Sequence, residues 1–170
     1  MSVNRYRYPE LPASIRAVLS KIVPSGDNKL PYYPCLVTLR SGEELDGVYL
    51  VPEDPFRAWW GIYPEEDPGK KSIRLEDVLA VKESPTRLPA DFANQIYRKG
   101  ESGNGYTIFT VVFAGGAREV CANANPIDFI RYPVGKGPSD VIEVLPHEGR
   151  GEKPVWGPDY YWCLFSGPVK

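Results

Sequence analysis

The chain has 170 residues, in which 20 lysines and arginines nearly balance 22 acidic residues, so the formal net charge is -2. This length allows one domain or two small, closely packed ones. A hydrophobic content of 42% at so low a net charge excludes an intrinsically disordered chain. The charge balance lacks the broad basic field of a dedicated nucleic-acid binder, and no apolar run reaches the ~20 residues of a membrane-spanning helix.

The cysteines and the N-terminal residues bear on the compartment. Cys35, Cys121 and Cys163 lie far apart and are odd in number, which is atypical of a secreted disulfide framework. The N-terminal residues contain no apolar run and no small-residue cleavage site, so we expect no signal peptide. The sequence therefore predicts a cytoplasmic protein with reduced thiols.

The first predicted element is a helix over residues 11–22. Ile15, Val18, Leu19 and Ile22 have the i, i+3, i+4, i+7 spacing that places apolar side chains on one helical face. We interpret this face as one that packs on the core, rather than on a membrane or a partner.

A hairpin over residues 35–50 is predicted next. Val37 and Leu39 alternate with polar neighbours, which is the period of a half-buried strand, and Gly42 lies in the turn. The proline-rich and acidic residues 52–71 predict a long loop, with a short extended piece at 59–63. Strands are expected at 73–75 and 78–81, joined by a turn.

The second half begins after a proline-bracketed linker. We expect a short helix at residues 89–97 and a glycine-rich turn before the next strand. The aromatic tail, 155–165, is expected to pack on the body. The predicted strands cover residues 106–114, 118–122 and 141–144. The predicted organisation is 1–84 for the helix and first strand set, 85–104 for the linker, and 105–170 for the second set, or one compact unit.

The two halves show the same order of landmarks, which favours an internal duplication. The alternative, that any chain of strand, turn, strand, loop and strand gives such a series, stays open. The first half has a strand at residues 36–39, then Gly42, Pro55, Tyr63-Pro64, Gly69-Lys70 and a strand at 77–81; the second has 110–113, Gly116, Pro126, Tyr132-Pro133, Gly135-Lys136 and 140–144.

Residues 35–54, Cys-Leu-Val-Thr-Leu-Arg-Ser-Gly-Glu-Glu-Leu-Asp-Gly-Val-Tyr-Leu-Val-Pro-Glu-Asp, resemble the first motif of the Sm-like small β-barrels. Gly42 stands at the turn of that motif, Gly47 at its sharp strand bend, and Asp54 at its acidic position. The resemblance covers about residues 12–81. It implies a mostly β protein of the α+β class, with an N-terminal helix and one or two small, strongly bent SH3-like or Sm-like β-barrels.

The chain departs from the Sm-like pattern where that family contacts RNA. Sm-like proteins carry a second motif with an Arg-Gly or similar pair, whereas Arg74 is followed here by Leu75 and an acidic pair. We therefore carry over the barrel and not the RNA site. An Sm-like RNA binder remains the second hypothesis, with a groove formed by Lys70, Lys71, Arg74 and Lys82.

Few residues favour catalysis. His147 is the single histidine, and it lies beside a flexible glycine-containing stretch, where a solvated loop residue is the more common role. A small enzyme that uses His147 with a carboxylate or Cys121 is the third hypothesis. Cys-x-x-Cys and His-x-x-x-His spacings are absent, so we expect no metal and no cofactor.

The most distinctive feature of the sequence is a pair of aromatic clusters, one of which is followed closely by acidic residues. Tryptophan and tyrosine concentrate at interface hot spots, and neighbouring acids would repel phosphate but attract a basic protein surface. Our leading hypothesis is a non-catalytic protein-binding, inhibitor or adaptor module with a basic partner. A homo-oligomer through barrel edge strands is a further expectation. The candidate binding residues are Trp59, Trp60, Tyr63, Glu65, Glu66 and Asp67.

Overall fold

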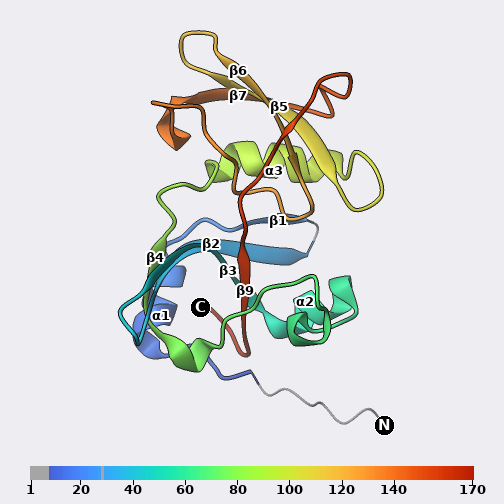
Figure 1. The fold of residues 1–170 in the computed structure, drawn as a ribbon. Helices are drawn as coiled ribbons and strands as arrows, with labels where there is room; N and C mark the ends of the chain where they lie inside the picture. The colour runs from blue at the N-terminus through green and yellow to red at the C-terminus, as the bar shows by residue number, and fades with distance from the viewer. Residues whose placement is uncertain (1–7, 28) are drawn as a thin grey trace.

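The computed structural model of the protein describes residues 8–27 and 29–170. Two mixed sheets, in which most strand pairs are antiparallel, lie one above the other, with α3 between them (Figure 1). The fold is a mixed α+β arrangement in which strands dominate, as the sequence predicts. The helices are α1 (Ala13–Leu19), α2 (Glu53–Trp60) and α3 (Ala90–Lys99). The first sheet contains β1 (Ser25–Asp27), β2 (Leu30–Leu39), β3 (Glu44–Pro52), β4 (Val78–Glu83) and β9 (Tyr161–Phe165); the second contains β5 (Thr107–Phe113), β6 (Arg118–Asn123), β7 (Val141–Pro146) and β8 (Val155–Trp156).

Helix α1 confirms the first predicted element. Ile15 and Leu19 are buried on its inner face, and Ile22 is buried just beyond its end. These side chains pack with residues of β2, β3 and β4 in the smaller of two hydrophobic clusters. The apolar face of this helix therefore stabilises the first sheet.

The prediction of a long loop over residues 52–71 is wrong, because this segment contains α2 and a 3-10 turn at Pro64–Glu66. Pro55 lies in the first turn of α2, where a missing N–H costs no intrahelical bond. Phe56 and Trp60, four residues apart, both pack against Trp162. Gly61 ends the helix in the left-handed conformation, at φ 74°. Tertiary packing on the tail explains why a proline-containing segment is helical.

The predicted strand at residues 73–75 is also wrong. Leu75–Asp77 forms a 3-10 turn directly before β4, and Leu75 is buried. Ile73 donates its N–H to Trp162 O at 2.8 Å, so the preceding segment lies along the tail strand β9. The chain here meets a strand that comes from the far end of the sequence.

Four strands of the first sheet have the same connectivity as the four strands of the second, and the first sheet contains β1 in addition. In the first sheet, β2 and β3 form a hairpin and β4 pairs with β2. In the second sheet, β5 and β6 form a hairpin and β7 pairs with β5. A strand from the C-terminal tail then adds in parallel to the second strand of the hairpin, β9 to β3 and β8 to β6. Among the described residues neither sheet closes on itself.

The register of β4 on β2 also agrees with that of β7 on β5. Leu39 pairs with Val78 in the first and Phe113 pairs with Val141 in the second, each after a shift of register. Just after these pairs, the Arg40 N–H donates to Asp77 O at 2.9 Å, and the Ala114 N–H donates to Asp140 O at 2.7 Å. Each acceptor is the last residue of the 3-10 turn before β4 or β7. The turn before β7 is Pro138–Asp140.

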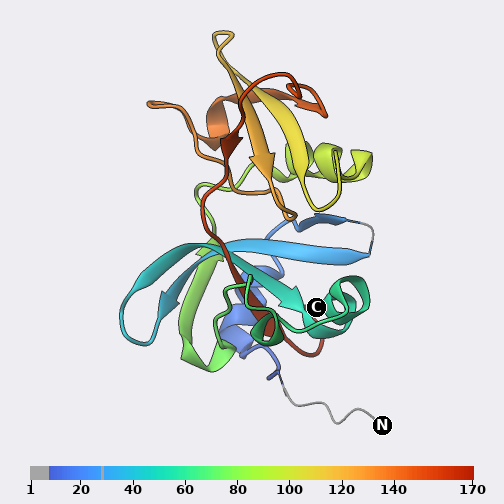
Figure 2. The same cartoon turned by 45° about the vertical axis from the view of Figure 1, so that its right-hand side comes forward.

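The C-terminal tail joins both sheets. It adds β8 to the second sheet, crosses to the first, and ends there as β9 (Figure 2). Trp162 of β9 is fully buried in the larger hydrophobic cluster, which contains residues of both sheets, α2 and α3. The predicted packing of this aromatic tail on the body is confirmed.

Candidate functional site

The candidate aromatic residues separate in the structure. Trp59 is 48% exposed on α2. Trp60 is half-buried and packs on Phe56 and Trp162, with ring centroids 6.0 and 5.8 Å away. Tyr63 is only 6% exposed, so its ring belongs to the core. Of the three predicted aromatic contacts, Trp59 offers the most open ring.

The candidate acidic residues lie after α2. Glu65 and Glu66 are exposed, and a Glu65 Oε accepts a hydrogen bond from the Tyr8 hydroxyl at 2.7 Å. Asp67 accepts a hydrogen bond from Lys70 Nζ, which lowers the pKa of the Asp67 carboxyl. Two exposed carboxylates therefore remain at this turn, while Asp67 forms an ion pair within the protein.

Trp59 borders an open hollow of about 810 Å³ that the sequence did not predict. The opposite wall is the end of α3, with Arg98 and Lys99, followed by Glu101. Asn94 of α3 accepts a hydrogen bond from the backbone N–H of Gly26 on β1, which positions this wall. The basic end of α3 is visible in the sequence, but nothing in the linear order places it beside residue 59.

The geometry around His147 is that of a loop anchor. Its Nε2–H donates to Lys99 O at 3.0 Å, and its Nδ1 shares a hydrogen bond of 2.7 Å with the Ser102 hydroxyl. Ser102 Oγ also accepts the N–H of Ile108 at 2.8 Å. Both ring nitrogens are thus engaged in holding the glycine-rich turn, and no carboxylate of residues 8–27 or 29–170 accepts a hydrogen bond from this ring as in a catalytic triad.

The three cysteines are buried thiols. Burial raises the pKa of Cys121 and of Cys163 to about 12, and it raises the pKa of Cys35 as well. A thiol with a raised pKa carries little thiolate at neutral pH, and the thiolate is the nucleophile.

Two of the three lysines proposed for an RNA groove, Lys70 and Lys71, are engaged by carboxylates. Lys71 Nζ lies 2.7 Å from Asp159, and this hydrogen bond raises the pKa of Lys71. Lys70 pairs with Asp67 and lies over the Trp60 ring, 4.7 Å from its centroid. Each positive charge is thereby balanced locally, which weakens any attraction to phosphate.

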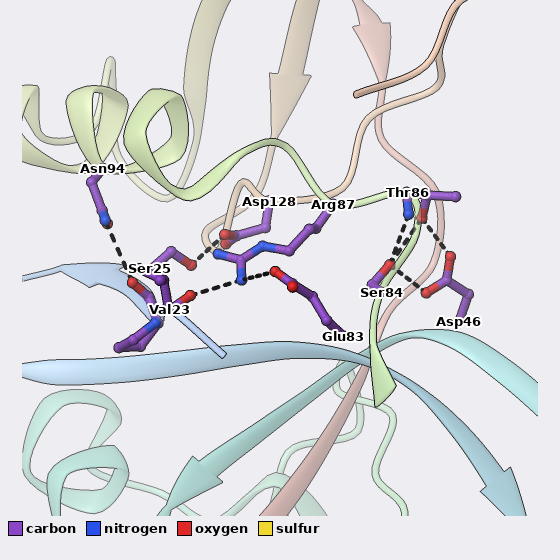
Figure 3. A network of polar contacts seen from close by, with 10 residues as sticks. Val23, Ser25, Asp46, Glu83, Ser84, Thr86, Arg87, Asn94 and Asp128 are labelled. Carbon is purple, nitrogen blue, oxygen red and sulfur yellow. Dashed lines mark hydrogen bonds and ion pairs between the residues drawn. The ribbon is translucent and has the colours of Figure 1, made fainter. Parts of the chain in front are cut away.

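A buried polar network joins the two sheets (Figure 3). The fully buried carboxylate of Asp128 accepts hydrogen bonds from the hydroxyls of Ser25, Tyr49 and Tyr97. Burial raises the pKa of this carboxyl despite those bonds. Arg87 lies beside it, buried, and donates to Val23 O at 2.8 Å. The network stabilises the relative position of β1, β3, α3 and the loop after β6.

Within the described part of the chain, no group of three or more histidine, cysteine or acidic side chains could hold a metal ion. Nor does that part contain a helix long and apolar enough to cross a bilayer. Comparisons with protein-family models, curated proteins and solved structures gave no match.

Proposed function

We propose that the chain is a non-catalytic protein-binding module whose contact surface is centred on α2. The observation that carries the proposal is the half-exposed ring of Trp59 beside the hollow formed with α3. Tryptophan is highly buried on average, and it is among the residues enriched at binding hot spots.

The support around Trp59 is rigid. Phe56, on the neighbouring helical face, is fully buried against Trp162, with ring centroids 4.9 Å apart. Helix α2 is therefore held by its packed face, and Trp59 is presented on a fixed backbone. A preorganised anchor loses little conformational entropy on binding.

The exposed acids favour a partner with a basic surface. Asp54 on the first turn of α2, and Glu65 and Glu66 after the helix, are exposed. These carboxylates would accelerate association with a cationic protein and make it sensitive to salt. An inhibitor or adaptor that covers a basic enzyme fits this arrangement.

The test of the contact surface is affinity capture from lysate of the source organism by the tagged chain, with mass spectrometry of the retained proteins. We expect a stoichiometric basic protein that resists nuclease, and its loss with Trp59→Ala. Trp156→Ala is the matched control, because Trp156 is an exposed tryptophan of the second sheet. Equal capture by Trp59→Ala and the unaltered chain would contradict the assignment to α2.

A second variant tests the electrostatic component. Replacing Asp54, Glu65 and Glu66 by their amides should slow association with the captured partner about tenfold at low salt and flatten its salt dependence. Glu143→Gln, at an exposed acid of β7, should leave both unchanged. An unaltered association rate in the triple variant would remove the basic partner from the proposal.

The Sm-like RNA hypothesis and the His147 enzyme hypothesis have less support. The first would be favoured by nuclease-sensitive, steeply salt-dependent capture. For the second, the two ring nitrogens of His147 already bind Ser102 and Lys99 O, and an activity lost in His147→Ala but retained in Ser102→Ala would revive it.

We also propose that the two halves are copies of one bent, Sm-like unit. Their common connectivity and the equal registers of β4 on β2 and of β7 on β5 support this proposal. An experimental structure in which the Leu39–Val78 and Phe113–Val141 registers differ would contradict it.

Two expectations about context also stay proposals. Three unpaired buried thiols support a reducing, cytoplasmic compartment, which cell fractionation would test.

Leu79 of β4 and Ile142 of β7, at equivalent exposed positions, support edge-strand association between copies. Sedimentation should then show a dimer that Leu79→Lys dissociates, and a monomer at all concentrations would exclude this mode.

A further inference from the structure

The open hollow of about 810 Å³ between α2 and the end of α3 has the size of a small-molecule site. The two helices lie on the same side of the molecule, with β1 between them (Figure 2). Trp59 lines one wall, and Arg98 and Lys99 line the other. An exposed ring thus faces the same space as two basic side chains.

A series of buried rings connects the two walls through the core. Tyr97 of α3 lies 5.8 Å from Tyr32, and Tyr32 lies 5.6 Å from Trp162, measured between ring centroids. Trp162 lies 4.9 Å from Phe56 of α2 in the same measure. The width of the hollow is therefore set by packed side chains, and a preorganised site loses little conformational entropy on binding.

The two basic side chains of the hollow are available to a ligand. Both are exposed, and among residues 8–27 and 29–170 no ion pair includes Arg98 or Lys99. Lys70 and Lys71, by contrast, are each bound to an aspartate. An anion could therefore bind in the hollow without breaking an existing ion pair.

The hollow is also lined by one acidic residue of the described chain, Glu101. Its carboxylate oxygens accept hydrogen bonds from the Gly105 N–H, at 3.2 Å, and from Asn125 Nδ2, which hold it in the glycine-rich turn. Two positive charges against one negative charge favour an anionic ligand. The exposed acids that we assign to the α2 surface do not line the hollow; they are Asp54, Glu65 and Glu66.

The ring and the two cations indicate the ligand's chemistry. A planar ring can stack on the exposed indole of Trp59. A phosphate monoester carries nearly two negative charges at neutral pH, so it matches two adjacent cations better than a carboxylate does. Arginine also binds phosphate through paired N–H groups.

We propose that this hollow binds a small molecule that combines a planar ring with a phosphate monoester, as a nucleoside monophosphate does. The ring stacks on Trp59, and the phosphate binds Arg98 and Lys99. The site needs no protein partner, and a ligand bound there competes with a partner that uses the Trp59 ring.

The probes are AMP and phenyl phosphate, with adenosine and inorganic phosphate as matched ligands that each lack one of the two groups. Binding is followed by ¹⁵N–¹H NMR of the Trp59 indole N–H and the Arg98 backbone amide. We expect saturable shifts with AMP at a Kd of ~1 mM or tighter, and affinities for adenosine and for phosphate about tenfold lower. Tighter binding of AMP than of phenyl phosphate would assign the site to nucleotides, and the reverse order would assign it to aryl phosphates.

A double variant, Arg98→Gln with Lys99→Gln, should weaken AMP binding about tenfold and leave adenosine binding unchanged. Arg118→Gln with Lys153→Gln is the matched control, because these exposed residues line a different hollow, on the second sheet. Equal affinity for AMP and adenosine, unchanged AMP binding in the first variant, or no shift at the Trp59 indole would overturn the proposal.

This proposal and the proposed function fail separately. Nucleotide binding is measured on the chain alone, and partner capture is measured without added nucleotide. Capture of a partner by a chain that does not bind AMP removes this inference only. Binding of AMP by a chain that captures no protein removes the proposed function only.

Discussion

Asp128 and Tyr49 exchange two hydrogen bonds across the junction of the two sheets. The Tyr49 hydroxyl donates to Asp128 Oδ1 at 3.2 Å and accepts the backbone N–H of Asp128 at 3.1 Å. One residue belongs to β3 and the other to the loop after β6, so this pair fixes the first sheet to the second half of the chain.

Loss of the Asp128 carboxylate should destabilise the whole fold. Asp128→Ala leaves three buried hydroxyls without their acceptor, and we expect a loss of about 3 kcal/mol in the free energy of unfolding. Asp128→Asn keeps one acceptor oxygen and should cost less. Urea unfolding followed by circular dichroism measures both, with Glu143→Ala at an exposed position as the control. An Asp128→Ala variant as stable as this control would contradict the structural role of the network.

The same carboxyl predicts a pH dependence. Burial raises the pKa of Asp128 above its ordinary value of 3.8, so the folded state binds this proton more tightly than the unfolded state does. The stabilisation from the protonated carboxyl is complete below 3.8 and is lost as the pH rises through the folded pKa. Relative to Asp128→Asn, the unaltered chain should therefore lose stability from about pH 4 towards neutral pH. A constant difference between the two chains over this range would show that the pKa is unshifted.

The tight approach of the tail to β3 predicts unequal effects at two left-handed glycines. Gly42 and Gly47 have φ values of 91° and 75°, which cost a residue with a Cβ ~1–2 kcal/mol. A Cβ at Gly47 would also lie 3.2 Å from Asp159 O, whereas one at Gly42 would meet nothing within 4 Å. Gly47→Ala should therefore be the more destabilising variant in thermal unfolding. Equal melting temperatures would mean that the tail does not lie against this bend.

The thiols should be inert in the folded protein. All three cysteines are buried, and their pKa values are raised by that burial, to about 12 for Cys121 and Cys163. With iodoacetamide at pH 8 we expect no labelling over minutes in buffer and labelling of all three in urea, read by intact mass. Rapid labelling of any one of them under native conditions would reveal a local opening.

The two faces of α2 should respond oppositely to truncation. Phe56 is fully buried, and Phe56→Ala should cost ~3–5 kcal/mol through the cavity that it leaves. Trp59→Ala should cost less than ~0.5 kcal/mol, since the ring is half exposed. Denaturant midpoints distinguish the two variants. A large loss of stability in Trp59→Ala would mean that this residue supports the fold and does not serve a partner.

Local sequence determined the elements whose cause is local. The helical spacing of Ile15, Leu19 and Ile22 gives α1, and the alternation around Val37 and Leu39 gives the first hairpin. The β-branched run before Gly115 and Gly116 gives β5 and the hairpin to β6 in the same way. These patterns work because a half-buried helix or strand imposes its own period on the chain.

Only the tertiary structure decided what lies beside the C-terminal tail. Trp162 supplies the buried surface against which residues 53–60 pack as a helix. Ile73 forms its backbone hydrogen bond with the tail strand, not within the predicted strand at 73–75. The same crossing places Gly157 beside Asn123.

The candidate binding residues of the α2 region were likewise predicted by sequence, but their exposure was decided by tertiary packing. The sequence marked Trp59, Trp60 and Tyr63 as one aromatic group, but local pattern cannot distinguish a ring that packs inward from one that stays open. The end of α3 became the wall opposite Trp59 through folding alone. Contacts between residues so far apart in the chain depend on which buried faces fit together, and no periodicity in the sequence encodes that fit.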